Sequence, residues 1–266
     1  MPLNLLSWLD EAKLACVPTQ EYWGNAGNEQ GKIFDVAELG FHRLEQNIKI
    51  QRAFQQTREM AQAHGIQFTG NTLSIAAGTC WLESWLIGQD AFAKLTCVDF
   101  SAHRIHELAP HTLEHYGVKN GEIDLVHGNA LQLRVPDKSQ DTILICRSFH
   151  HFEEPRSLLR EMRRILKDDG KVLISGEHYF DFSTRAKAIF HHFRRFMTNS
   201  RNYRSIRTFF PEHQMLFPPS FEKGDIHYSK FEYHNMFKAT GFDYEHHVDK
   251  SKTLQGFILR KSLGNS

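Results

Sequence analysis

Apolar and polar positions alternate in a regular rhythm from about residue 70 onward. The mainly apolar runs at Thr72–Ala76 and Lys94–Val98 predict strands buried on both faces. Amphipathic segments that end at glycines separate the runs and predict helices. Further strands are predicted at residues 124–127, 141–146 and 171–175, and helices at residues 82–88, 102–116 and 157–166. This alternation indicates a doubly wound α/β domain with a parallel sheet covered on both faces.

Near the C-terminus the order of the predicted helices and strands changes. A helix is predicted over Lys230–Thr240, followed by strands at Phe242–Val248 and Leu254–Arg260. Only Asp249–Thr253 separates these two strands, which is too short for a parallel crossover and favours an antiparallel hairpin. The expected fold is therefore a seven-stranded, mostly parallel sheet that ends in an antiparallel hairpin.

Two segments fall outside this pattern. Residues 1–20 and 35–64 have apolar side chains at helical spacings, so we expect a helical N-terminal cap over residues 1–65 and the main domain over residues 66–266. Residues 180–226 interleave arginines with aromatic residues and predict an insertion. We expect this insertion to form a lid over an anionic or aromatic substrate. The alternative is that it forms a surface that binds single-stranded nucleic acid.

Composition narrows the function classes. The chain has 266 residues and a net charge of +1, which gives no overall affinity for nucleic acids or membranes. Its four cysteines are scattered and predict buried thiols in a reducing compartment. There is no signal-peptide pattern and no apolar run long enough for a membrane span, so we expect a cytoplasmic protein. The sequence leaves open whether it forms a homo-oligomer.

The candidate site lies where the first two predicted strands end. The small residues Ala76, Ala77, Gly78 and Thr79 allow a ligand to approach the backbone, and Asp99 ends the next strand. A carboxylate there can accept hydrogen bonds from a ribose diol, which is the arrangement of a nucleotide site in a doubly wound sheet. Alternatively, Asp99 stabilises the start of the next helix, and Gly78 is a plain strand–helix turn.

Five segments, in order and at the right spacing, carry a family resemblance. They are Leu73–Cys80, Val98–Ser101, Val126–Ala130, Ser148–Pro155 and Leu158–Leu173. Together they resemble class I S-adenosylmethionine (SAM)-dependent methyltransferases, in the small-molecule branch related to the ubiquinone and menaquinone enzymes. The resemblance covers roughly residues 70–178. It implies a Rossmann-like fold, SAM as cofactor, and in-line transfer of its methyl group to a small-molecule substrate.

The resemblance also implies cofactor-binding positions. These are Ala76, Ala77, Gly78, Thr79, Asp99, Phe100, Asn129, Ala130 and Arg147, and Trp23 is added as an aromatic face for the sulfonium. Asn129 would accept from the adenine amino group or serve only as a turn residue. Arg147 would bind a carboxylate of the cofactor or substrate, or form a surface ion pair with Glu153 or Glu154. Trp23 could equally be a core residue.

Departures from the family pattern motivate two other hypotheses. Serine stands at position 74, where the family usually has an acid, and Ala76 and Cys80 stand where it has glycines. The turn must then use ordinary backbone angles at Ala76 and Cys80 or hold strain. A non-catalytic SAM or nucleotide binder is therefore an alternative, and the arginine-rich insertion makes an RNA methyltransferase a third.

Histidines near the methyl donor are the candidates for a general base. We rank His151 first, then His150, then His178, because an imidazole titrates near neutral pH. The alternative is that these histidines only pack or cap the loop. His191 and His192 lie beside two arginines but lack a closed ligand set, so we predict a solvated helix face and no metal site.

Overall fold

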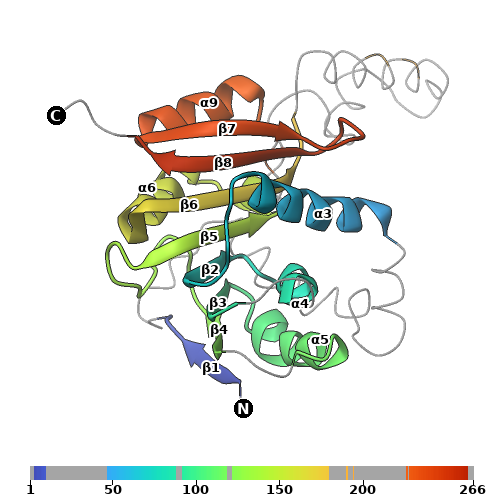
Figure 1. Cartoon of the computed structure of the whole chain (residues 1–266), viewed down its shortest axis with the longest axis vertical. Coiled ribbons are helices and arrows are strands. Elements are labelled where there is room, and N and C mark those ends of the chain that lie inside the picture. The colour runs from blue at the N-terminus through green and yellow to red at the C-terminus, as the bar shows by residue number, and fades with distance from the viewer. Residues whose placement is uncertain are drawn as a thin grey trace, which may run out of the picture.

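The computed structural model describes residues 3–9, 47–87, 92–118, 122–179, 226 and 228–262, together with residues 190 and 194. An eight-stranded sheet runs through this part of the chain in the order β1-β4-β3-β2-β5-β6-β8-β7 (Figure 1). The strands are β1 (Asn4–Ser7), β2 (Asn71–Ile75), β3 (Lys94–Asp99), β4 (Glu122–His127), β5 (Gln140–Cys146), β6 (Leu166–Glu177), β7 (Phe242–Val248) and β8 (Gln255–Lys261).

The predicted mostly parallel sheet with a terminal hairpin is confirmed. All neighbouring strands from β1 to β6 pair in parallel, whereas β8 pairs antiparallel with both β6 and β7. The hairpin turn is closed by Asp249, whose Oδ1 accepts hydrogen bonds from the backbone N–H groups of Thr253 and Leu254, both at 2.7 Å.

Helices cover both faces of the sheet. They are α3 (Ile48–Ala63), α4 (Trp81–Ile87), η2 (a π-helix, His103–Leu108), α5 (Ala109–His115), η3 (Phe149–His151), α6 (Pro155–Ile165) and α9 (Lys230–Ala239). Figure 1 shows α3, α4 and α5 side by side, with α6 and α9 across the sheet from them. The alternation of side chains along the strands divides the core accordingly.

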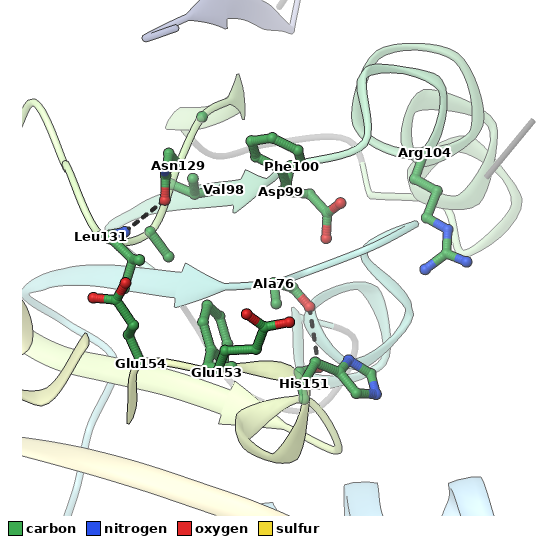
Figure 2. Close-up of a pocket in the computed structure, with 14 residues that line it drawn as sticks. Ala76, Val98, Asp99, Phe100, Arg104, Asn129, Leu131, His151, Glu153 and Glu154 are labelled. Carbon is green, nitrogen blue, oxygen red and sulfur yellow. Dashed lines mark hydrogen bonds between the residues drawn. The ribbon is translucent and has the colours of Figure 1, made fainter. Parts of the chain in front are cut away.

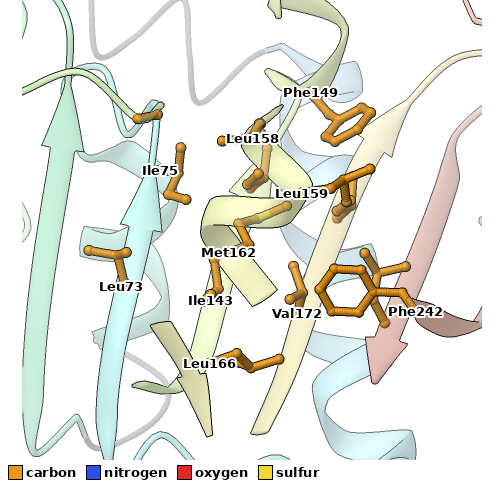
Figure 3. Packing of buried hydrophobic residues seen from close by; sticks show 14 of the residues in the cluster. Leu73, Ile75, Ile143, Phe149, Leu158, Leu159, Met162, Leu166, Val172 and Phe242 are labelled. Atoms are coloured by element: carbon orange, nitrogen blue, oxygen red, sulfur yellow. The ribbon is translucent and has the colours of Figure 1, made fainter. Parts of the chain in front are cut away.

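The core on the α6 and α9 side is the larger one. Leu73 and Ile75 of β2 meet Leu158 and Met162 of α6 there, and all are essentially inaccessible to solvent (Figure 3). On the opposite face, Leu144 and Leu173 pack with residues of α3 and α4, such as Met60 and Leu86. Burial of this kind contributes about 1.5–3 kcal/mol for each large apolar side chain.

The prediction of a helix at residues 1–20 is wrong where the structure describes it. Residues 4–7 form β1, which pairs in parallel with β4 from Asn4–Asp124 to Ser7–His127 and gives the sheet its eighth strand. Leu5 and Leu6 are 51% and 39% exposed, so the backbone ladder with β4, rather than apolar burial of these two, holds the segment. A short apolar run cannot distinguish a helix from a strand by its period.

Of the rest of the predicted N-terminal cap, the structure describes residues 47–65. Helix α3 begins after Asn47, whose side chain accepts hydrogen bonds from the backbone N–H groups of Lys49 and Ile50, and Gly65 follows it with φ +61°. It packs directly against β5, β6 and β8. Residues 10–46 and most of the 180–226 insertion lie outside the described residues, so the domain division at residue 65 and the lid stay predictions.

Candidate functional site

The candidate site lies at the carboxyl ends of β2, β3 and β5. Strand β2 pairs with β3 on one side and β5 on the other, so the chain reverses its winding direction there. Ligands of doubly wound sheets bind in the crevice at such a switch point. Two adjoining cavities open at this edge, and four residues line both of them: Ala76, Arg104, Ser148 and His151.

The predicted acid, Asp99, lines the first cavity. Asp99 is 9% exposed, and Figure 2 shows its carboxylate directed into the space between Ala76 and Arg104. Phe100, Asn129 and Ala130, which the resemblance assigns to cofactor binding, also line this cavity. The remainder of its wall is largely apolar, from Val98, Leu131 and Phe152, with Glu153 and Glu154 on one side.

Asp99 connects the end of β3 to the bend after β2 through a hydrogen bond. Its Oδ2 accepts from the backbone N–H of Gly78 at 2.7 Å, and its Oδ1 accepts from that of Ser101 at 2.8 Å. Burial raises the pKa of Asp99, and these two hydrogen bonds oppose that effect. An ionised carboxylate has about four acceptor positions, so each oxygen can accept once more from a ligand. Asp99 therefore fixes the bend and retains binding capacity.

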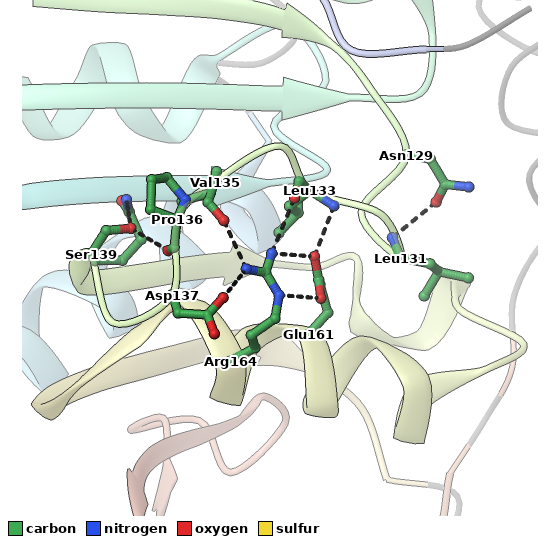
Figure 4. A network of polar contacts seen from close by, with 10 residues as sticks. Asn129, Leu131, Leu133, Val135, Pro136, Asp137, Ser139, Glu161 and Arg164 are labelled. Carbon is green, nitrogen blue, oxygen red and sulfur yellow. Dashed lines mark hydrogen bonds and ion pairs between the residues drawn. The ribbon is translucent and has the colours of Figure 1, made fainter.

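Asn129 forms the predicted turn and also lines the first cavity. Its Oδ1 accepts from the backbone N–H of Leu131 at 2.9 Å, which forms a local turn after β4 (Figure 4). The same residue lines the first cavity. The turn is anchored further along by Arg164 of α6, which donates to the backbone carbonyls of Leu133 and Val135 at 3.1 and 2.8 Å.

The bend after β2 is strained rather than ordinary. Ala76 and Cys80 have φ of +53° and +58°, and Gly78 between them has φ of +57°. Positive φ costs a residue with a Cβ about 1–2 kcal/mol. The strain falls on the two positions where the resembled family has glycine, and it is held by the Gly78–Asp99 hydrogen bond and by burial of Cys80.

We therefore expect Ala76→Gly to stabilise the protein, although glycine normally destabilises. Relief of positive φ should exceed the greater entropy of glycine in the unfolded chain, for a net gain of about 0.5–1 kcal/mol. Urea unfolding followed by circular dichroism measures it. Ala53→Gly within α3 is the control and should lose about 1 kcal/mol or more. A loss at position 76 equal to that at position 53 would contradict the strain.

The second cavity holds the remaining members of the predicted bend and a set of charged groups. Ala77, Gly78 and Thr79 line it together with Arg147 and His150. Arg147 has φ +55°, and its backbone N–H donates to Ser175 O at 2.8 Å. Among the described residues it forms no ion pair, so the alternative of a surface pair with Glu153 or Glu154 is not found.

His150 has a buried carboxylate behind it. Its Nδ1 lies 2.8 Å from Oε2 of Glu177, a side chain with no solvent exposure. Glu177 also accepts from the backbone N–H of Phe149 at 3.1 Å and from the hydroxyl of Tyr233 at 3.0 Å. A carboxylate bound to Nδ1–H leaves Nε2 as the unprotonated, basic nitrogen. Glu177 was not among the predicted site residues, because the predicted fifth strand ended at residue 175.

The other histidine candidates are placed differently. His151 lines both cavities, and its ring contacts that of His150 edge-on at a centroid distance of 4.4 Å. His178 is not among the described residues that line either cavity; its Nδ1 lies 3.3 Å from Thr253 O, and burial lowers its pKa. Trp23 lies outside the described residues.

Arg104 is a further residue that the sequence did not single out. It belongs to the π-helix η2 and lines both cavities. A π-helical turn inside an amphipathic segment leaves the apolar pattern largely intact, so no sequence signal marked it.

One group of possible metal ligands occurs in the described part of the chain, away from both cavities. It consists of His64, Glu245 and His247, whose ligand atoms lie within 4.8 Å of one another. Arg260 donates to Nδ1 of His64 at 3.1 Å, so Nε2 carries the proton and faces Nε2 of His247 at 2.9 Å. A metal at Nε2 requires a protonated Nδ1 instead. The present contacts therefore favour a hydrogen bond between the rings.

Comparisons with known proteins agree with this geometry. Residues 73–174 match the family model described as a methyltransferase domain. The chain is 24% identical over 140 residues to a demethylmenaquinone methyltransferase of Geobacillus stearothermophilus, covering 52% of this chain and 58% of that protein. It is 28% identical over 144 residues to a ubiquinone/menaquinone biosynthesis C-methyltransferase of Hahella chejuensis, covering 53% and 51%. The matches thus span little more than half the length of these relatives.

Among solved structures, magnesium protoporphyrin IX methyltransferase from Synechocystis, with bound S-adenosylhomocysteine (SAH), superposes with a TM-score of 0.62. The match covers 91% of this chain and 98% of that one at 12% identity. This likeness confirms the predicted fold, and the family model and the two relatives support the resemblance to SAM-dependent methyltransferases. No helix in the described ranges is long and apolar enough to cross a membrane.

Proposed function

We propose that this chain transfers the methyl group of SAM to a small-molecule acceptor, because residues 73–174 match a methyltransferase domain. The observation that carries the proposal is the Asp99 carboxylate, buried at the tip of β3 and lining the first cavity. The residues around it fit an adenosine. Asp99 can still accept from ribose hydroxyls, and the apolar wall formed by Val98, Leu131 and Phe152 suits a flat base.

SAM supplies a methyl group on a positively charged sulfur, which is reactive without further activation. The chain's own residues must therefore bind the donor, align the acceptor and exclude water. The acceptor atom forms a bond to the methyl carbon while the carbon–sulfur bond breaks, and the sulfur leaves with that electron pair as a neutral thioether.

A base is needed where the acceptor must lose a proton. We propose His150 for this role, in place of His151, which the sequence analysis ranked first. Its Nε2 is the basic nitrogen, because the Nδ1–H is held by Glu177, and the residue lines the second cavity. The proton of the acceptor passes to Nε2, and Glu177 stabilises the imidazolium that results. His151, in contact with His150, would position the acceptor instead.

The acceptor class is proposed from the names of the relatives and from this base. Those names concern demethylmenaquinone and ubiquinone/menaquinone biosynthesis. A hydroxylated aromatic ring is the acceptor that such a histidine could activate by removing the hydroxyl proton. Selection among such rings by residues 180–226 is a further part of the proposal, and those residues fall almost entirely outside the described ranges.

The test measures methyl transfer from labelled SAM to a panel of hydroxylated aromatic compounds. His150→Gln is expected to lower kcat about 100-fold or more while SAH affinity stays within about twofold, because only the base is removed. His151→Gln is the matched control and should raise KM more than it lowers kcat. Equal loss in both variants would contradict the assignment of the base to His150.

The rival functions give different results. A non-catalytic binder would bind SAH but transfer no methyl group to any acceptor tested. An RNA methyltransferase would bind RNA with an affinity that falls steeply as salt rises. Absence of SAH binding by the wild-type protein would remove the proposed function altogether.

A further inference from the structure

Strand β1 lies at one edge of the sheet and is additional to the seven strands that the sequence predicts (Figure 1). All four of its residues are exposed, so β1 contributes little to the core. Its contacts instead lie close to the first cavity. Gly128 and Asn129, which line that cavity, directly follow β4, the strand with which β1 pairs. A strand placed in this way can determine the position of the cavity wall without adding to the core.

The first link between β1 and the cavity is Trp8, the residue after the strand. Its backbone N–H donates to the carbonyl oxygen of His127 at 2.9 Å and continues the ladder with β4. Its side chain packs on Gly128, where an added Cβ would lie 3.5 Å from both Cβ and Cε3 of Trp8. The same added Cβ would lie 3.2 Å from Cγ1 of Val98. The backbone of Gly128 is therefore closely packed against Trp8 and Val98, and Gly128 and Val98 both line the first cavity.

Two histidines that the proposed reaction does not use form a second link. His106 belongs to η2, and its Nε2–H donates to the backbone carbonyl oxygen of Leu6 at 3.0 Å. The ring of His106 contacts that of His127 edge-on, at a centroid distance of 6.0 Å. His127 ends β4, and its Nε2–H donates to the carbonyl oxygen of Phe100 at 3.1 Å. Phe100 lines the first cavity, and Arg104, which is also in η2, lines both cavities. Strand β1 is thus connected to two further segments of the wall.

Strand β1 itself is held by few interactions. Besides the backbone ladder, the side-chain amide of Asn4 donates to Oδ1 of Asp124 at 2.9 Å, in an exposed position. Edge segments with few buried contacts open locally at a lower free energy than core strands do. Because the contacts that hold β1 also hold Gly128 and η2, opening of β1 releases the wall of the first cavity. A ligand that binds the ordered wall more tightly must therefore stabilise the docked strand.

We propose that β1 and Trp8 form a positioning strap for the adenosine of the methyl donor, and that docking of the strap on β4 and binding of the cofactor strengthen each other. The inference rests on the proposed function for the identity of the ligand in the first cavity. Trp8 is not among the described residues that line either cavity, so it acts through Gly128 and is a positioning residue. Any process that removes the strap from β4 is expected to lower the affinity for the cofactor.

The first test measures the affinity of the full chain for SAH by calorimetry. Trp8→Ala removes the ring from Gly128 and should lower SAH affinity at least about fivefold, the lower end of the usual coupling between two sites. Trp8→Phe restores an aromatic ring and should bind SAH within about threefold of the wild type. Leu5→Ala is the matched control on the same strand, because Leu5 is 51% exposed, and its SAH affinity should stay within about twofold.

The second test uses the wild type alone and so does not depend on how well a variant folds. Coupling is reciprocal, so saturating SAH should slow hydrogen exchange of the Trp8 amide at least about fivefold. The amide of Asp249, which donates to the carbonyl oxygen of Leu254 at 3.1 Å in the remote hairpin, is the internal control. Its exchange rate should not change with SAH.

Three results would overturn the strap while leaving the proposed function in place. They are wild-type SAH affinity in Trp8→Ala, an equal loss of affinity in Trp8→Ala and Leu5→Ala, and exchange of the Trp8 amide that SAH does not slow. Absence of SAH binding by the wild type would instead refute the proposed function, and the strap with it.

Discussion

Replacing Asp99 by asparagine is expected to weaken SAH binding by about 100-fold or more. Two hydrogen bonds from ribose hydroxyls to a carboxylate contribute about 1.5–3 kcal/mol each, and a neutral amide recovers only part of this. The amide also disturbs the bend. Both carboxylate oxygens accept from backbone N–H groups, of Gly78 and Ser101, and the new NH₂ must face one of those donors.

The matched control for this prediction is Asp124→Asn. Asp124 lies on β4, is paired with Thr96 of β3 in the ladder, and is not among the residues that line the cavities. Asp124→Asn removes the same negative charge as Asp99→Asn, and its SAH affinity should stay within about twofold of the wild type. Circular dichroism confirms that both variants fold. Asp99→Asn with wild-type affinity for SAH would show that Asp99 serves only to hold the bend.

Glu177→Gln is expected to reduce both stability and turnover. The glutamine keeps one acceptor for three buried or partly buried donors, from Phe149, His150 and Tyr233, and places its own NH₂ among them. Loss of one partner of a buried charged pair costs about 3–5 kcal/mol, and the partial exposure of His150 places the expected loss near the lower end. Turnover should fall about tenfold or more, because His150 loses the group that fixes its tautomer.

The stability difference should depend on pH with a definite sign. Burial raises the pKa of Glu177, but the charge of His150 and the hydrogen bonds from His150 and Tyr233 outweigh it, so the net pKa lies below the ordinary 4.5. The ionised carboxylate therefore stabilises the fold above about pH 4.5, and this contribution disappears as pH falls through the lowered pKa.

Urea unfolding of the wild type and of Glu177→Gln between pH 3 and pH 7.5 measures this effect. The difference in unfolding free energy should shrink as pH falls. Glu114→Gln on α5 is the exposed control and should change stability by no more than about 0.5 kcal/mol at any pH. A Glu177→Gln effect that does not vary with pH would mean that the ionised carboxylate contributes nothing specific.

The sequence predicted the parts of the site that depend on long apolar runs. The runs that became β2 and β3 placed the bend at residues 76–79 and the acid at Asp99 on neighbouring strand ends, and the two are hydrogen-bonded through Gly78. Parallel pairing brings the carboxyl ends of neighbouring strands to one edge of a sheet, independently of the loops that connect them. This part of the prediction therefore succeeded.

Residues that depend on exact element boundaries or on tertiary contacts were missed. Glu177 lies beyond the predicted end of its strand, because pairing with β8 extends β6 to that residue. Glu83 was not singled out from the sequence, because only the packing of α4 on β2 buries it against Ser74. Strand β1 was read as a helix because its pairing with β4 is remote in sequence.

The central claim is that the edge of the sheet around Asp99 binds the adenosine of the methyl donor. A crystal structure of the protein with SAH tests it most directly. We expect the ribose hydroxyls on the Asp99 carboxylate and the adenine against Val98, Leu131 and Phe152, with the sulfur facing His150 and His151. A complex in which both cavities stay free of the ligand, or in which Asp99 contacts only backbone, would contradict it.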